Sequence, residues 1–139
     1  MKSTPNGLTG SKGSFARSLM PLTTEKEAMN MRPGSNFWLE QNGKVVLSEW
    51  RIALLEAVER TGSINAAAAV LGVHFRVAWR KLKEMEEGLG VKLTKRVVGG
   101  KHGGGTELTP EGRDYVRRFH VFTAGLKEIR NKQFKKAFK

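Results

Sequence analysis

Two stretches near the middle of the chain repeat apolar residues at the three- and four-residue spacing of a helix face. The first stretch predicts a helix from Glu49 to about Arg60, with inner residues Trp50, Ala53, Leu54, Ala57 and Val58. The second predicts a longer helix over 74–87, with an apolar stripe of Ala78, Leu82, Met85 and Leu89. Between them, Ala66–Leu71 is short and rich in alanine, so another helix can cross it closely.

The boundaries between these helices carry their own signals. Ser63 is a good N-cap because its hydroxyl can accept a backbone N–H of the first turn. Gly72 can take the positive φ needed to end the alanine-rich helix and turn sharply, and Val73 then returns to the core. Two short helices joined by such a turn predict a helix-turn-helix. His74 is predicted at the N-cap of its second helix, where its side chain can cap the helix or reach a base edge of DNA.

Strand signals stand on both sides of this helical core. Phe37–Gln41 and Lys44–Leu47 flank Asn42-Gly43, the strongest short signal for a β-hairpin. After the helices, Val91–Val98 alternates loosely, with Val91, Leu93 and Val97 on one face, and Thr106–Thr109 forms the next strand. The glycine-rich segment 99–105 lies between these two strands, a pattern typical of a wing over 91–109 beside a helix-turn-helix.

A long helix is predicted from Pro110 to the end of the chain. Thr109 caps it, and Pro110 takes its first position, where a missing N–H costs nothing. Its apolar residues alternate at spacings of four and three, as in the seam of a coiled coil: Tyr115, Phe119, Phe122, Leu126 and Ile129. We favour a dimer interface for this seam, although packing within one subunit would need a similar stripe. The last stretch, 132–139, is expected to fray.

The predicted organisation is therefore mainly α with a small β wing. Residues 1–35 form a disordered extension, because their Ser-, Thr-, Gly- and Pro-rich composition cannot bury enough apolar surface. Residues 36–109 form a winged helix-turn-helix with an N-terminal hairpin, and 110–139 form the dimerisation helix with a basic tail. For the extension, two explanations stay open. Translation starts at Met29 or Met31, or the segment is a basic arm.

Composition narrows the range of partners. Lys and Arg number 25 against 13 Asp and Glu, giving a net charge of +12, which favours polyanions, nucleic acid above all. The sequence has no cysteine, and its longest clearly apolar run is far shorter than a membrane span needs. We therefore expect a cytoplasmic protein with no membrane partner.

The exposed side of the 74–87 helix is the main candidate for chemistry. Arg76, Arg80 and Lys83 share that side, where Arg can pair with guanine and Lys can neutralise phosphate. Phe75 and Trp79 lie among them, and large exposed aromatic residues on a short helix need a reason. They contact DNA, or Trp79 instead packs against the wing or the hairpin.

The sequence gives little support for nucleotide binding, metal binding or catalysis. The glycine-rich segment lacks the Gly-Lys-Ser/Thr run that opens a helix in a phosphate-binding loop, since His102 follows Lys101. The histidines are scattered with no ligand pair at helical spacing, so we predict no metal. Lys83, Glu84, Glu86 and Glu87 suggest a solvated stretch with local ion pairs. We predict no enzymatic activity.

Three segments together resemble the DNA-binding domain of ModE-type regulators and, more distantly, that of LysR-type regulators: GSINAAAAVLGVHFRVAWRKLKEME, LTKRVVGGKHGGG and LTPEGRDYV. The resemblance covers roughly Ser48 to Leu126 and implies a dimer that controls transcription at a palindromic operator. By position it implies DNA contacts at Ser63, Phe75, Arg76, Trp79, Arg80, Arg96 and Lys101. Full-length ModE proteins carry C-terminal molybdate-binding domains, and we expect none in this chain, because only one predicted helix follows the wing. We expect a short, stand-alone form with no cofactor and an effector that the resemblance does not name.

Three hypotheses follow. The chain is a dimeric, sequence-specific regulator of transcription that binds double-stranded DNA. Alternatively, it is a protein-interaction module on a winged-helix scaffold, or a DNA binder of the nucleoid type without sequence preference.

Overall fold

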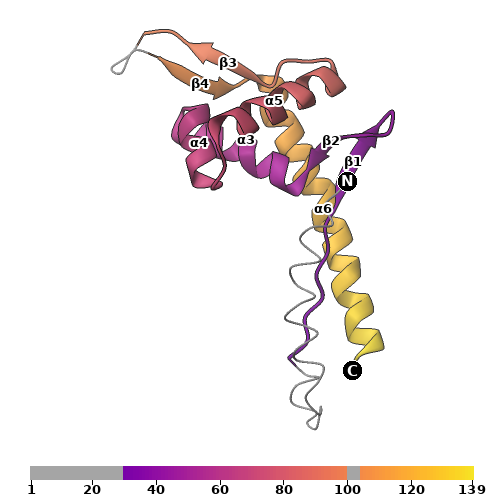
Figure 1. Cartoon of the computed structure of the whole chain (residues 1–139). Coiled ribbons are helices and arrows are strands. Elements are labelled where there is room, and N and C mark those ends of the chain that lie inside the picture. The colour runs from indigo at the N-terminus through magenta and orange to yellow at the C-terminus, as the bar shows by residue number, and fades with distance from the viewer. Residues whose placement is uncertain (1–29, 100–103) are drawn as a thin grey trace. The chain divides into compact units, whose positions relative to one another are not determined.

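A computed structural model of the chain describes residues 30–99 and 104–139. The chain divides into two units, Met1–Pro33 and Gly34–Lys139, and every described helix and strand lies in the second. The predicted extension lies outside the described residues up to residue 29, as does Lys101. The order along the chain is β1 (Trp38–Gln41), β2 (Lys44–Ser48), α3 (Glu49–Thr61), α4 (Ile64–Val70), α5 (Phe75–Leu89), β3 (Thr94–Val97), β4 (Gly105–Leu108) and α6 (Pro110–Ala137) (Figure 1).

Three helices, α3, α4 and α5, form the bundle that the sequence predicts. Ser48, Ser63 and His74 cap them, each with a side chain that accepts a backbone N–H of the first turn. Ser63 caps α4 as predicted, so the helix begins at Ile64 and contains most of the alanine-rich stretch. Gly72 has a φ of 71°, which confirms the left-handed turn between α4 and α5.

The core lies where α3 meets the other elements. Leu54, Ala57 and Val58 of the predicted stripe are fully buried, whereas Trp50 is half-buried at the edge. Ile52 and Leu55 are also buried, so α3 is covered on more sides than one stripe requires. The reason is that α3 contacts α4 and α5 as well as β4 and α6.

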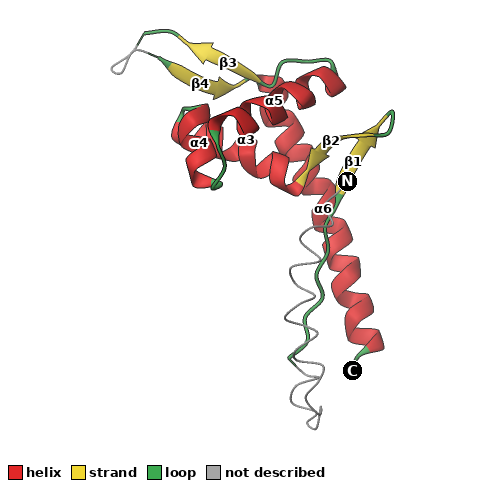
Figure 2. Cartoon of the chain, in the orientation of Figure 1, coloured by secondary structure: helices red, strands yellow, loops and turns green. Residues whose placement is uncertain are grey.

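The two hairpins are separate antiparallel ribbons (Figure 2). In the first, Asn42 and Gly43 have φ values of 55° and 78°, which confirms the turn predicted between β1 and β2. The second ribbon is the wing. Its first strand, Thr94–Val97, is shorter than the predicted 91–98, and Val97 at its end is 39% exposed.

The helix α6 starts as predicted, with the Thr109 hydroxyl accepting the Gly112 N–H and Pro110 in the first turn. It continues to Ala137, so the predicted fraying over 132–139 is not what the structure contains. Phe119 is 3% exposed and belongs to the core of the subunit, next to the partly buried Tyr115. The assignment of Phe119 to a dimer interface is therefore corrected. Its side chain is already covered within one subunit.

Candidate nucleic-acid interface

The outer side of α5 carries the predicted side chains together. Phe75 and Trp79 are 41% and 46% exposed, and Arg76 and Arg80 are also exposed. The His74 Nδ1 accepts the Arg76 N–H at 3.2 Å, so this exposed ring caps the helix as predicted. Trp79 keeps nearly half of its surface exposed, and the Lys83 ammonium lies 5.3 Å from its ring centre.

A groove of about 770 Å³ separates this side of α5 from the wing. It brings together the predicted residues Ser63, Phe75, Trp79, Lys83 and Arg96. Its other lining residues are Ile64, Asn65, Lys92, Thr94, Lys95, Val97, Gly104, Gly105, Thr106 and Thr109. Four of the lining residues are cations and none is an acid, so the groove suits a chain of phosphates. Arg76 and Arg80 do not line the groove, and they lie on the exposed surface of α5.

Sequence reasoning missed several of these lining residues, above all Asn65, Lys92 and Lys95. Lys92 and Lys95 are cations within the predicted wing, so the signal was present. Both lysines could have been predicted by treating every basic side chain of the wing as a candidate for phosphate contact. Asn65 gave no signal, because a polar residue in the first turn of a short helix is common at any surface.

Glu86 holds the wing against α5. Its side chain is 7% exposed, and its Oε2 accepts the backbone N–H groups of Leu93 and Thr94 at 2.9 and 3.2 Å. Its Oε1 lies 3.4 Å from the Nζ of Lys83 and 3.9 Å from that of Lys92. The prediction that Glu86 belongs to a solvated stretch is wrong, because the carboxylate is buried and paired on both oxygens.

The second wing strand is fixed from the other side. The Thr106 N–H donates to the Gly62 carbonyl at 2.8 Å, and a Cβ added at Gly105 would lie 2.5 Å from that oxygen. Thr109 donates its hydroxyl to the Lys92 carbonyl at 2.7 Å and its N–H to the Leu93 carbonyl. Both strands of the wing are thus bonded to the helical bundle at their bases.

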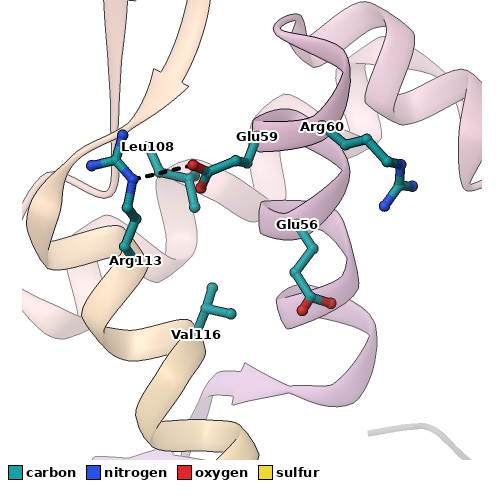
Figure 3. A pocket seen from close by; sticks show the side chains of 6 residues that line it. All are labelled: Glu56, Glu59, Arg60, Leu108, Arg113 and Val116. Carbon is teal, nitrogen blue, oxygen red and sulfur yellow. Dashed lines mark hydrogen bonds and ion pairs between the residues drawn. The ribbon is translucent and has the colours of Figure 1, made fainter.

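A second cavity, of about 270 Å³, lies between α3 and α6 (Figure 3). Arg113 points across it to Glu59, with 3.1 Å between Nε and Oε2, and Glu56, Arg60, Leu108 and Val116 complete the lining. Two carboxylates, Glu56 and Glu59, line this space, whereas none of the residues that line the groove beside α5 is an acid. The second cavity is therefore a poor site for phosphate compared with the groove beside α5.

The remaining residues of the predicted seam are more exposed than Phe119. Phe122 is 39% exposed and packs edge-on against Phe37 and Phe119, Leu126 is half-buried, and Ile129 is 57% exposed. The outer side of the helix is charged. Arg117 and Arg118 both pair with Asp114, and the hydrogen bond from Arg117 is the main cause of the lowered pKa of that carboxyl.

Within residues 30–99 and 104–139, no cluster of three or more His, Asp or Glu side chains is arranged to hold a metal ion. Over the same ranges, no helix has the length and apolar content of a membrane span.

Comparison with known proteins agrees with this geometry. Residues 51–113 match the family described as bacterial regulatory helix-turn-helix protein, lysR family. The chain is 43% identical over 83 residues to the molybdenum transport protein ModE of Azotobacter vinelandii, covering 60% of this chain and 31% of that protein. It is 37% identical over 91 residues to the molybdenum-pterin-binding protein MopB of Rhodobacter capsulatus, covering 66% of this chain and 33% of that protein.

The chain thus spans about a third of the length of these curated relatives. Among solved structures, it is similar to one described as a crystal structure of a CbnR_DBD-DNA complex, at 28% identity and a TM-score of 0.46. That overlap covers 60% of this chain and 93% of the other. These relatives confirm the resemblance to ModE-type regulators that the sequence analysis describes.

Proposed function

We propose that this chain, whose residues 51–113 are a LysR-type helix-turn-helix, is a sequence-specific DNA-binding regulator of transcription. The observation that carries the proposal is the groove between α5 and the wing, with four cations and no acid in its lining. Two exposed arginines, Arg76 and Arg80, stand beside it on the same helix. A protein that binds the chromosome in this way acts in the cytoplasm.

In the proposed mode of binding, α5 and the wing, which face each other across the protein groove, have different roles. The exposed side of α5 enters the major groove, where Arg76 and Arg80 can pair with the O6 and N7 of guanine. Lys83, Lys92, Lys95 and Arg96 contact phosphates of one strand, and the wing lies along the backbone or the minor groove. The phosphate contacts set affinity and register, while the arginines of α5 set sequence preference.

We further propose that two copies bind together through the exposed half of α6. Phe122 and Ile129 leave apolar surface open on that helix, which runs to Ala137. A dimer with two-fold symmetry would place its half-sites about one helical turn of DNA, roughly 34–36 Å, apart.

The direct test is a titration of labelled duplex DNA at several salt concentrations, followed by selection of bound fragments from genomic DNA. If the four groove cations of one subunit each neutralise a phosphate, log K against log salt should have a slope of about −3.6, and twice that for a dimer. Enrichment of one palindromic sequence supports the regulator. A salt slope without enrichment supports a nucleoid-type binder, and no binding at low salt supports the protein-interaction module.

A further inference from the structure

Glu86 is the only acidic residue of α5 that the structure buries. The exposed side of α5 carries the candidate base contacts, and the wing carries Arg96, a candidate backbone contact. Glu86 connects the two, since its carboxylate sits on α5 and accepts the N–H groups of Leu93 and Thr94 where the wing begins. A carboxylate that is 7% exposed is costly to bury, and the backbone donors and two lysines offset that cost.

We infer that Glu86 is a positioning residue for DNA binding, which sets the wing relative to the recognition helix so that both contact one duplex. This inference rests on the proposed function. Glu86 would not touch DNA, because its oxygens are occupied by Leu93, Thr94, Lys83 and Lys92. It acts through Arg96, which follows Thr94 by two residues along β3.

The same carboxylate also places two of the groove cations. The Nζ atoms of Lys83, on α5, and Lys92, in the loop before β3, both lie within 3.9 Å of one oxygen, Oε1. Two ammonium groups this close to each other repel unless an anion lies between them. Glu86 therefore holds a pair of cations at the base of the groove, where phosphates are proposed to pass.

Because Glu86 is negatively charged, a positioning role and a purely electrostatic role predict opposite changes in DNA affinity when it is removed. Removing an acid from a basic groove should strengthen DNA binding if charge alone matters. Loss of a positioning residue should instead weaken binding, even though the net charge becomes more favourable. Glu87→Gln makes the same charge change at an exposed position of α5 and serves as the matched control.

The decisive experiment is a set of double-mutant cycles on the full chain with a labelled duplex. In the wild-type chain, Arg96→Ala should weaken binding by about tenfold or more, as expected for one charge-assisted hydrogen bond. In the Glu86→Ala chain, the same change should cost less than about twofold, because the wing no longer presents that side chain to the duplex. Arg80→Ala, on α5 itself, should have the same effect in both chains, which a general loss of folding would not allow.

Glu86→Gln keeps one oxygen for the Leu93 and Thr94 N–H groups and should restore much of the Arg96 effect. It also covers the case in which Glu86→Ala does not fold. An equal effect of Arg96→Ala in all three backgrounds, or tighter DNA binding by Glu86→Ala than by Glu87→Gln, would overturn the inference.

A measurement without DNA keeps this inference separate from the proposed function. Amide hydrogen exchange of Leu93 and Thr94 should become about tenfold faster in Glu86→Ala, while amides in the middle of α3 keep their rates. Unchanged exchange at Leu93 and Thr94 would refute the tether, whether or not the chain binds DNA. If exchange becomes faster in Glu86→Ala but the wild-type chain binds no duplex DNA, both the proposed function and the positioning role are overturned. Glu86 would then only hold the start of the wing against α5.

Discussion

The backbone N–H of Thr106 donates to the carbonyl oxygen of Gly62 at a distance of 2.8 Å. Gly62 ends α3 with a φ of 78° and directly precedes the Ser63 cap of α4, whereas Thr106 belongs to the second strand of the wing. One hydrogen bond therefore joins the start of the helix-turn-helix to the wing. The approach is close because Gly105, beside Thr106, has no side chain to keep the two backbones apart.

Gly105→Ala should destabilise the fold. The added Cβ would lie 2.5 Å from the Gly62 oxygen, a backbone atom that cannot move without shifting the turn. We expect a loss of about 1–3 kcal/mol in the free energy of unfolding, measured by urea denaturation. Gly125→Ala is the control, since nothing lies within 4 Å of its Cβ and alanine should stabilise α6 by roughly 0.5–1 kcal/mol. Equal stability of the two variants would contradict the close approach.

Sequence preference should depend on residues of α5, whereas general affinity for DNA should depend on residues of the wing. Arg76→Ala and Arg80→Ala should each reduce the preference for the selected operator over random DNA, by about 1–3 kcal/mol for a residue that pairs with a base. Lys95→Ala should weaken binding to both DNAs alike and make the salt slope shallower by about 0.9. Competition titrations at two salt concentrations measure both quantities. A loss of preference in Lys95→Ala, with none in the arginine variants, would reverse the assignment.

Glu84→Gln should destabilise the chain although Glu84 lies partly at the surface. Its Oε1 is 2.9 Å from a guanidinium nitrogen of Arg51, whose side chain is only 10% exposed. Without that carboxylate a nearly buried cation loses its charged partner, at a cost of about 1–3 kcal/mol. Thermal and urea unfolding report the change, and Glu87→Gln should leave stability within about 0.5 kcal/mol. A Glu84→Gln chain as stable as Glu87→Gln would show that solvent screens the pair.

The sequence predicted the elements of this fold well wherever the signal is local. Asn42-Gly43 predicts the turn that joins the two strands of the first hairpin. Ser48, Ser63 and Thr109 mark the starts of three helices, because the hydroxyl of each accepts a backbone N–H of the first turn. Such signals act over three or four residues, so no knowledge of tertiary contacts is needed. The basic side of α5 was predictable for the same reason.

The sequence could not predict which side chains contact partners that lie elsewhere along the chain. Glu86 looks like its neighbours Glu84 and Glu87, and only the path of the chain into β3 brings the Leu93 and Thr94 N–H groups to its carboxylate. Phe119 likewise fits a seam by spacing alone. Its place in the core depends on how α6 crosses α3, which periodicity does not determine.

The two parts of the α6 seam should respond differently to substitution. Phe119 is buried within the subunit, so Phe119→Ala should cost about 3–5 kcal/mol in the free energy of unfolding by leaving a cavity. Ile129 is 57% exposed, and Ile129→Lys should leave the stability of one subunit nearly unchanged while raising the dimer dissociation constant by about tenfold or more. Sedimentation over a range of concentrations measures association, and DNA affinity should fall with it, because a monomer reads one half-site. Should Ile129→Lys associate like the wild type, the exposed half of α6 is not the surface that joins two copies, and the spacing of the half-sites must be set elsewhere.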